Sequence, residues 1–361
     1  MLHQKHSSMP QFTEVAEFLA KGESLLLDAR SPSEYSRAHV PGAVSFPLFS
    51  DEERAEVGTI YKQVGPQEAL LRGLEFVGPR MAEFIREANR LNPDRLPMRM
   101  YCFRGGQRSQ SLAWLLEKGG FEVDLLQGGY KAYRRHVLAS FDETQEVLVL
   151  SGCTGSAKTR ILHALQELGE QVIDLEGLAC HRGSAFGGYE QPDDLTSEMV
   201  ENRLYSEWSK LDRTRRVWLE DEGRNLGRVY LPDGFWKQLR QAPVIFIDIP
   251  FEERVKFLVQ EYGHFDHDLL SGSVDRIAKR LGPQNHAMCR EAVDAGDYAE
   301  VVRITLRYYD KAYRYNLEKR APEPLFELEL PEIEVERNAR RLVEFADQCL
   351  PSASRSLEAL K

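Results

Sequence analysis

One cysteine lies in surroundings that favour a reactive thiolate. Cys102 comes near the end of a predicted strand, Met98 to Phe103, and a helix is predicted to follow from Arg108 to Lys118. Adjacent glycines let backbone N–H groups turn toward one point, and a helix N-terminus and two arginines add positive charge. Such surroundings stabilise a thiolate, so we expect Cys102 to be a nucleophile near neutral pH. A buried structural cysteine beside a turn is the alternative.

The same loop is predicted to cradle a small anion. Its candidate residues are Arg104, Gly105, Gly106, Gln107, Arg108 and Ser109.

A second segment has the pattern of a phosphate-binding loop. The apolar run Val147 to Leu150 leads into it, and a helix is predicted from Thr159 to Leu168. Gly152, Lys158 and Thr159 fit the pattern G-x-x-x-x-G-K-[ST]. Backbone N–H groups of such a loop hold a diphosphate, the lysine neutralises its charge, and the threonine can hold Mg²⁺. The predicted diphosphate-binding residues are Gly152, Thr154, Gly155, Ser156, Ala157, Lys158 and Thr159.

Ala157 departs from this pattern, because it stands where the second glycine is expected. Its methyl group is expected to narrow the space for a phosphate, although alanine is compatible with the start of a helix.

Acidic residues at the ends of two predicted strands are candidates for a carboxylate that assists Mg²⁺. Glu220-Asp221-Glu222 ends the strand that begins at Val217, and we assign the metal to Thr159 and Glu220. Asp174, at the end of the strand Val172 to Leu175, competes for this role. A capping role for these acids stays open.

The segment Asp174 to Gly187 combines a base, a guanidinium group, hydroxyls and glycines just beyond a predicted strand. These groups suit an anionic or polar substrate, and a polar surface loop is the alternative. The candidate residues are Asp174, Glu176, His181, Arg182, Gly183 and Ser184.

Strand-like and helix-like runs alternate along the chain, which is typical of α/β architecture. A helical pattern from Glu68 to Leu91 has a break at Gly78-Pro79, and the region after Tyr298 is mostly helical in pattern. The length of 361 residues suits two domains, predicted as residues 1–140 and 141–361. Other predicted strands are Ser24–Asp28, Ala43–Phe46, Val123–Leu126 and Val244–Ile249.

Composition narrows the class of protein. The net charge of -10 excludes a globally basic nucleic-acid binder but allows a local basic patch. The five cysteines are odd in number and include no CxxC, which argues against a disulfide framework or a zinc ribbon. No apolar run is long enough to span a bilayer, and the first residues lack the pattern of a signal peptide. We therefore expect a cytoplasmic protein with no membrane partner.

Several short blocks in the first part of the chain form one pattern. They are Leu27-Asp28-Ala29-Arg30, Glu34-Tyr35, His39-Val40-Pro41-Gly42-Ala43, the Cys102 loop and Leu126-Gln127-Gly128-Gly129-Tyr130. With these blocks, residues 24–137 resemble a rhodanese domain. The resemblance implies that Cys102 carries sulfur or selenium as a persulfide or perselenide, and that His39, Asp28 and Arg30 have structural roles.

The combination of all these blocks closely resembles the bacterial tRNA 2-selenouridine synthase family. Gly129 to Arg134 and Val57 to Gly65 also match that family, so the resemblance covers nearly the whole chain. It implies an N-terminal rhodanese-like domain and a C-terminal P-loop NTPase-like domain with a parallel sheet and a helical extension.

The resemblance also implies a two-step transferase activity on tRNA. A geranyl group from geranyl diphosphate is first attached to the sulfur of 2-thiouridine at the wobble position (34). Selenium from selenophosphate, made by selenophosphate synthetase, then replaces the geranylated sulfur. Mg²⁺ is expected with the diphosphate, and no tightly bound cofactor is expected.

Two basic clusters are candidates for contacts with tRNA phosphates, and both are predicted on helices or helix ends. A solvated face is the alternative for each. They are Arg213, Arg215 and Arg216, and Arg276, Lys279 and Arg280. Core packing is favoured over base stacking for Tyr308, Tyr309, Tyr313 and Tyr315.

Two other functions fit parts of the pattern. One is a rhodanese-type sulfurtransferase fused to an ATP- or GTP-dependent kinase-like domain. The other is a phosphate-gated RNA- or protein-binding module whose cysteine senses redox state. The segment Asp174 to Gly187 favours the tRNA-modifying enzyme, because generic kinases and sulfurtransferases have no need for it.

Overall fold

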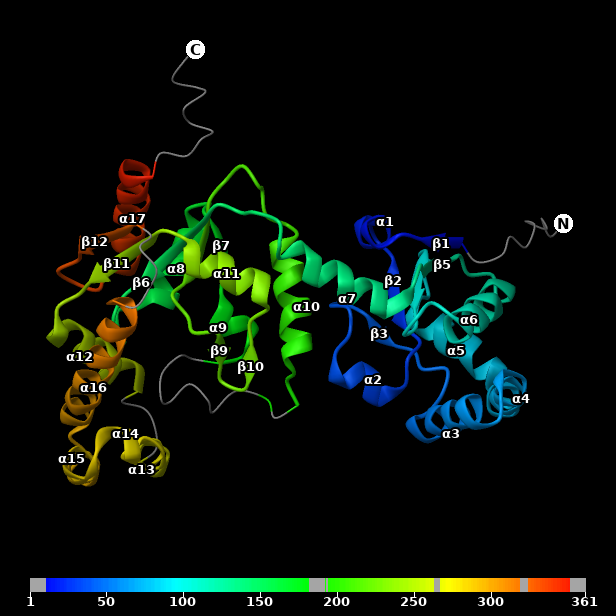
Figure 1. The fold of residues 1–361 in the computed structure, drawn as a ribbon, viewed down its shortest axis with the longest axis horizontal. Helices are drawn as coiled ribbons and strands as arrows, with labels where there is room; N and C mark the ends of the chain where they lie inside the picture. The colour runs from blue at the N-terminus through cyan, green and yellow to red at the C-terminus, as the bar shows by residue number, and fades with distance from the viewer. Residues whose placement is uncertain (1–10, 182–191, 193, 263–266, 319–323, 351–361) are drawn as a thin grey trace, which may run out of the picture. The chain divides into compact units, whose positions relative to one another are not determined.

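The computed structural model describes residues 11–181, 192, 194–262, 267–318 and 324–350 (Figure 1). The chain divides into two compact units. The first consists of Met1–Ser140 with Glu201–Arg203, and the second of Phe141–Val200 with Leu204–Lys361.

The first unit is built on a five-stranded parallel sheet with the strand order β1-β5-β4-β2-β3. Its strands are β1 (Gln11–Thr13), β2 (Leu25–Asp28), β3 (Val44–Ser45), β4 (Met98–Tyr101) and β5 (Val123–Leu126). Because parallel strands are covered by helices on both faces, their side chains are apolar on both faces. Leu27, Met98 and Met100 are completely buried in this core.

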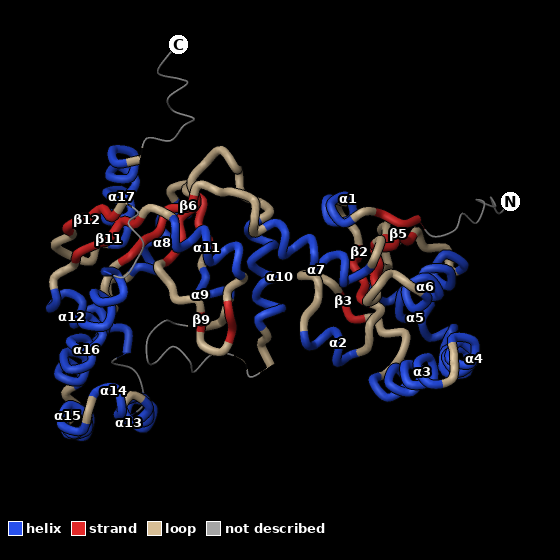
Figure 2. The backbone as a smooth tube through the Cα atoms, in the orientation of Figure 1, coloured by secondary structure: helices blue, strands red, loops and turns tan. Residues whose placement is uncertain are grey.

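Helices connect the strands of the first unit, and Figure 2 shows the strands grouped among them. They are α1 (Val15–Ala20), α2 (Pro32–Arg37), α3 (Asp51–Gln63), α4 (Pro66–Val77), the 3₁₀ helix η1 (Gly78–Arg80), α5 (Met81–Leu91), α6 (Gln107–Lys118) and α7 (Gly129–Ser140). The predicted break at Gly78-Pro79 is confirmed as η1, since proline cannot continue the hydrogen bonding of α4. Helix α3 was not predicted.

The second unit also contains a five-stranded parallel sheet, with the strand order β12-β11-β6-β8-β7. Its strands are β6 (Val147–Ser151), β7 (Gln171–Ile173), β8 (Val217–Glu220), β11 (Val244–Asp248) and β12 (Leu325–Glu329). A separate antiparallel hairpin joins β9 (Asn225–Leu226) and β10 (Val229–Tyr230). Strand β6 lies in the centre of the sheet, so the loop that follows it lies between neighbours on both sides.

The helices of the second unit differ widely in length. They are α8 (Lys158–Glu167), α9 (Leu175–Leu178), α10 (Ser197–Trp208), α11 (Asp233–Gln241), α12 (Phe251–Tyr262), α13 (His267–Arg276), α14 (Ala278–Leu281), α15 (Pro283–Asp294), α16 (Tyr298–Glu318) and α17 (Val335–Cys349). Ala339 and Leu342 of α17 are buried in the same core as Leu148 and Leu162.

The α/β class predicted from the sequence is confirmed, with a parallel sheet in each unit. The prediction for the region after Tyr298 needs one correction. Strand β12 lies within that region and pairs in parallel with β11, and α17 then packs onto the core of the sheet. This region therefore completes the P-loop sheet as well as extending it with helices. No helix in the described part of the chain is both long and apolar enough to cross a membrane.

Candidate functional site

Cys102 lies directly after β4 and is almost fully buried at the edge of the first core. Its Sγ accepts a hydrogen bond from Ser109 Oγ at 3.2 Å and lies 3.8 Å from the carbonyl oxygen of Gly106. These contacts hold the sulfur at the first turn of α6, where free backbone N–H groups favour an anion. The predicted position of the thiol at a helix N-terminus is therefore the observed one.

The glycines of the loop allow a close approach between two chain segments. Gly105 has a φ of +65°, and a Cβ there would lie 2.9 Å from the carbonyl oxygen of Leu126. Gly129 has a φ of +61°, and its Cβ would lie only 2.3 Å from the carbonyl oxygen of Cys102. Of the two adjacent loop glycines, only Gly105 has a positive φ, because the φ of Gly106 is -97°.

The two arginines of the loop differ in their charge partners. Arg108 donates to Glu34 at 2.6 Å, so Glu34 neutralises part of the charge that was assigned to the anion. Burial opposes ionisation of Glu34, yet the hydrogen bond and charge of Arg108 lower its pKa below the ordinary value. Arg104 instead lies over the ring of Phe103 at 5.9 Å. The Gln110 side chain donates to the carbonyl of Gly105 and stiffens the loop.

The residues assigned structural roles lie in buried or stacked positions. Asp28 and Arg30 form a buried ion pair at 2.6 Å, and Arg30 lies over the ring of Tyr130 at 3.8 Å. The ring of His39 stacks on Tyr35 at 4.0 Å and its Nδ1 lies 3.0 Å from the Tyr35 carbonyl. These contacts agree with a structural role for all three residues.

The predicted phosphate loop follows β6 and leads into α8. Lys158 Nζ donates to the carbonyl of Gly152 at 2.7 Å, so the lysine side chain reaches back across the loop. Ser156 Oγ donates to the carbonyl of Cys153 inside the loop. The loop residues from Thr154 to Thr159 line a cavity of about 820 Å³. The predicted strand–loop–helix context is thus present, with the lysine at the start of the helix.

Ala157 adopts a left-handed backbone conformation, with φ 57° and ψ 26°, immediately before α8. The expectation that alanine suits a helix start does not describe this position, because Ala157 precedes the helix in a region that glycine prefers. The loop thus keeps the glycine conformation without the glycine.

We expect Ala157→Gly to raise the free energy of unfolding by about 0.5–1 kcal/mol. The left-handed conformation costs an alanine about 1–2 kcal/mol, and the freedom of glycine in the unfolded chain cancels part of the gain. Urea unfolding measures the change. Ala164→Gly, in the interior of α8, is the matched control and should lower stability by about 1 kcal/mol. A lower stability of Ala157→Gly would contradict the argument.

Residues far away in the sequence fix the shape of the loop. Arg254 is buried, forms an ion pair with Asp310 at 2.7 Å and donates to the carbonyl of Thr154 at 3.1 Å. The hydroxyl of Tyr313 accepts from the N–H of Gly152 at 3.2 Å and donates to Asp221 at 3.1 Å. No motif in the sequence predicted these two contacts, because Arg254 of α12 and Tyr313 of α16 come close to the loop only in the folded protein.

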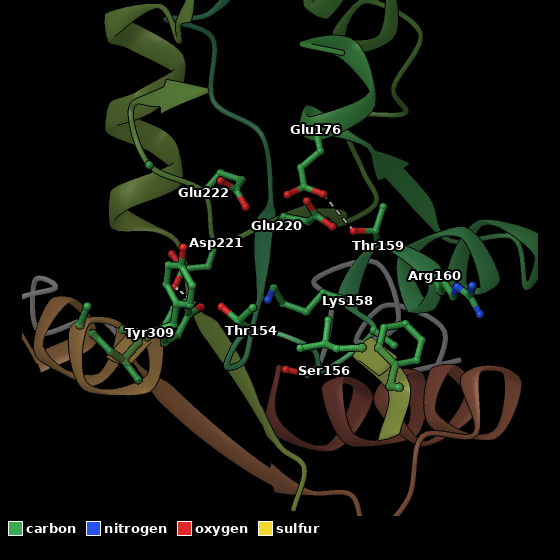
Figure 3. A pocket seen from close by; sticks show the side chains of 18 of the residues that line it. Thr154, Ser156, Lys158, Thr159, Arg160, Glu176, Glu220, Asp221, Glu222 and Tyr309 are labelled. Carbon is green, nitrogen blue, oxygen red and sulfur yellow. Dashed lines mark hydrogen bonds between the residues drawn. The ribbon is translucent and has the colours of Figure 1, made fainter. Parts of the chain in front are cut away.

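Three glutamates gather next to the loop (Figure 3). Carboxylate oxygens of Glu176, Glu220 and Glu222 lie within 4.8 Å of one another, and Thr159 Oγ1 donates to Glu176 at 3.2 Å. Glu220 is 1% exposed, and among the described residues neither of its carboxylate oxygens has a hydrogen-bond partner. A buried, unpartnered carboxylate that faces two others is costly unless a cation or protons compensate it.

The pKa values of this cluster carry the same information. Burial first, and then repulsion from Glu176 and Glu222, raise the pKa of Glu220 well above its ordinary value. Burial and repulsion from Glu176 raise the pKa of Glu222 to about 7, against the opposing charge of Lys158. Oxygen ligands of this kind suit a hard divalent cation such as Mg²⁺.

Comparison with known proteins places these two sites in one family. The family model described as the tRNA 2-selenouridine synthase AAA domain matches residues 145–336, and that of the rhodanese-like domain matches residues 11–136. A curated tRNA 2-selenouridine synthase from Salmonella typhi is 35% identical over 85% of this chain and 93% of its own length. This chain belongs to the tRNA 2-selenouridine synthase family.

Two further relatives agree with this assignment. The tRNA 2-selenouridine synthase of Nitrosomonas europaea is 38% identical over 66% of this chain and 63% of its own length. The Salmonella arizonae protein of the same name is 35% identical over 83% of this chain and 92% of its own length.

In this member of the family, the segment after β7 divides into structural and site-facing parts. Asp174 caps α9 by accepting from the N–H of Gly177 at 2.7 Å, and its other oxygen lies 3.1 Å from His163 Nε2. Asp174 is therefore engaged outside the glutamate cluster, whereas Glu176 belongs to it. Nδ1 of His181 is buried without a hydrogen-bond partner among the described residues. Arg182, Gly183 and Ser184 lie outside the described residues.

In the first of the two clusters assigned to tRNA, the structure corrects one residue, Arg216, whereas Arg213 and Arg215 are exposed. Arg216 is buried and pairs with Glu170 at 2.8 Å and Asp347 at 2.7 Å, so it is committed to the fold. Arg213 pairs with Glu143 at 3.0 Å, and Arg215 donates to the carbonyl of Gly169. These arginines lie in the connection between α10 and β8, not on a helix as predicted.

The second cluster keeps its predicted character. Its three side chains are exposed, at the end of α13 and on α14, and they are Arg276, Lys279 and Arg280. The predicted core role of the tyrosines fits Tyr313, which is held against the P-loop, whereas Tyr315 is 56% exposed.

Proposed function

We propose that this protein converts 2-thiouridine at the wobble position (34) of tRNA into 2-selenouridine through a geranylated intermediate. The observation that supports it most is that the chain belongs to this family and contains both reactive loops, the Cys102 loop and the P-loop. The first loop is suited to a chalcogen nucleophile and the second to a diphosphate, and the two proposed half-reactions need these two chemistries.

The cavity at the P-loop is the proposed site of geranyl transfer. It is lined by the phosphate loop on one side and by the apolar side chains of Trp236, Phe257, Leu258 and Leu317 on others. Geranyl diphosphate has the same division into an anionic head and an apolar chain. The sulfur of 2-thiouridine attacks C1 of the geranyl chain, the C–O bond breaks, and diphosphate leaves to the P-loop and Lys158.

The residues that would hold Mg²⁺ with the diphosphate are Glu176, Glu220, Glu222 and Thr159. The unpartnered oxygens of Glu220 fit a cation, and their donor set is hard oxygen. When bound, the ion neutralises charge on the leaving diphosphate. The sequence predicted Thr159 and Glu220 as metal ligands. It indicated Glu222 only as part of an acidic run and Glu176 only as part of a substrate segment.

We expect Glu222→Gln to stabilise the metal-free protein at alkaline pH. The folded-state pKa of Glu222 is raised to about 7, whereas its unfolded value is near 4.5. The folded protein therefore binds the proton more tightly, so rising pH costs stability between these two values and no more above them. The variant should gain about 1–3 kcal/mol over wild type at pH 8.

Urea unfolding in chelator from pH 4.5 to 8 measures this difference. The gap between the two proteins should grow up to about pH 7 and then stay constant. Glu261→Gln, on the rim of the same cavity, is the control and should show no such growth. A pH-independent gap would contradict the assignment of the raised pKa to Glu222.

Cys102 is the residue that we assign to the selenium step. Selenium becomes bonded to C2 of the base, the C2–S bond breaks, and the sulfur leaves with its geranyl chain as geranylthiol. Alkylation makes this sulfur a better leaving group, because it can depart as geranylthiol instead of as sulfide. Water supplies the oxygen of the phosphate that selenophosphate leaves behind, and selenophosphate synthetase is the expected source of selenophosphate.

Mass spectrometry of tRNA nucleosides tests the function directly. Purified protein is incubated with tRNA that contains 2-thiouridine, geranyl diphosphate and Mg²⁺, and a second arm adds selenophosphate. We expect a geranyl group in the first arm and 2-selenouridine in the second. No change in either arm, together with thiosulfate turnover and nucleotide hydrolysis, would instead favour the sulfurtransferase with a kinase-like domain.

A further inference from the structure

A second cavity, of about 870 Å³, opens beside the Cys102 loop within the first unit. Helices α3 and α4 and the start of α6 form its walls, and Cys102 itself lines it. Its size lies within the range of about 300–1,000 Å³ that is usual for small-molecule sites. Much of the segment from Val57 to Gly65, which matched the family without a role, lies in the α3 wall.

The walls of this cavity present large apolar side chains that no core covers. Tyr61 is 60% exposed, Leu74 is 56% exposed and Leu70 is 43% exposed, and all three line the cavity with Phe103 of the cysteine loop. Scattered exposed apolar residues need no explanation, but several that line one hollow mark a binding site for an apolar ligand.

Basic side chains lie among the apolar ones. Arg54 and Arg108 line the cavity but are engaged by Glu34, at 3.7 and 2.6 Å. Lys62 and Arg104 also line it, and neither has an ion pair with a residue in the described part of the chain. An apolar hollow with two uncommitted cations fits an apolar chain that is attached to a polyanion, and it fits neither a free lipid nor a plain nucleotide as well.

We propose that this cavity binds the prenyl chain of the geranylated tRNA base while the Cys102 loop handles selenium. The inference rests on the proposed function, because that function brings a geranylated base to Cys102. It adds that the prenyl chain leaves the P-loop cavity and is bound a second time, by α3 and α4. Selenium transfer is then selective for a long alkyl chain on sulfur, beyond the leaving-group effect that any alkyl group supplies.

Two neighbouring leucines of α4 allow a matched test. Leu74 and Leu71 are both 56% exposed, but only Leu74 lines the cavity. A charge at either position is compatible with folding, whereas a glutamate at position 74 puts a carboxylate in the path of the chain. Leu74→Glu and Leu71→Glu are compared with wild type on tRNA carrying S-geranyl-2-thiouridine or S-methyl-2-thiouridine, with selenophosphate.

We expect wild type and Leu71→Glu to prefer the geranyl substrate by about 100-fold in kcat/KM, since each buried methylene contributes about fourfold and burial of about three to four of the chain's carbons in this open cavity gives that factor. Leu74→Glu should lower this preference to within about fivefold, with geranyl transfer to 2-thiouridine unchanged. An unchanged preference in Leu74→Glu would overturn the proposal. An equal loss on both substrates would also overturn it, and would favour a role for α4 in tRNA or partner docking.

A second measurement does not depend on the proposed reaction. Iodoacetamide alkylates Cys102, and peptide mass spectrometry measures the rate of this reaction. Geraniol in the cavity should slow the alkylation by at least about fivefold in wild type and in Leu71→Glu. Leu74→Glu should lose this protection. If neither alkylated tRNA is converted but protection is seen, the proposed function fails and a prenyl-binding cavity remains. Absence of protection in wild type rejects the cavity as the prenyl site.

Discussion

Cys102→Ala should abolish 2-selenouridine formation and leave geranyl transfer within about twofold of wild type. The thiol lies at the N-terminus of α6, where it accepts a hydrogen bond from Ser109, and no other sulfur lines the cavity beside it in the described residues. Removal of a nucleophile of this kind costs on the order of 10³-fold or more in rate. We assign geranyl transfer to the P-loop unit, so the geranylated base should accumulate. Liquid chromatography with mass spectrometry of digested tRNA measures both products.

Two further cysteine variants sharpen this experiment. Cys102→Ser keeps the size of the side chain and its hydrogen bond with Ser109 but lacks a nucleophilic sulfur, so it should fail as the alanine variant does. Cys349→Ala, in α17, changes a half-buried cysteine outside both cavities and should be active. Selenation by Cys102→Ala at a normal rate would remove Cys102 from the reaction and leave it a structural cysteine.

The sequence predicted the reactive loops well because their information is local. Both loops follow short apolar strands, and their glycines, lysine and cysteine lie within a few residues of one another. Strand β12 escaped prediction because the segment LFELE stands in a charged, helical region and is stabilised only by pairing with β11. Helix α3 has a charged pattern with no fully buried residue, so its helical period carried no apolar stripe.

The glutamate cluster was predictable only in parts. Glu220 follows from its place at the end of a strand beside the P-loop strand, and Glu222 lies two residues further along, but Glu176 comes from α9 in another part of the chain. Arg216 was misassigned because a run of arginines does not say which side chain points inward. Its burial between Glu170 and Asp347 depends on α17, which packs there only in the finished fold. Tyr313 and Arg254 shape the P-loop from two distant helices for the same reason.

Two lysine variants separate a specific role of the P-loop lysine from the general effect of removing one positive charge. Lys237→Ala, in α11, removes an exposed lysine that does not line the P-loop cavity, and it should transfer geranyl groups at the wild-type rate. Lys158→Ala removes the charge that faces both the Gly152 carbonyl and the glutamates. Normal geranyl transfer by Lys158→Ala would mean that the P-loop serves another ligand.

We expect Lys158→Ala to lower geranyl transfer by about 10²–10³-fold, the usual cost of a charged donor at a developing anion. Its loss acts twice, because diphosphate loses a cation and the carboxylates lose the charge that opposes their raised pKa values. Selenation of tRNA that is already geranylated should proceed normally, since Cys102 and its cavity belong to the other unit. Supplying that intermediate to Lys158→Ala, and geranyl diphosphate with plain 2-thiouridine tRNA to Cys102→Ala, therefore assigns each half-reaction to one loop. A defect of Lys158→Ala on both substrates would instead indicate that the P-loop unit is needed to bind tRNA in either step.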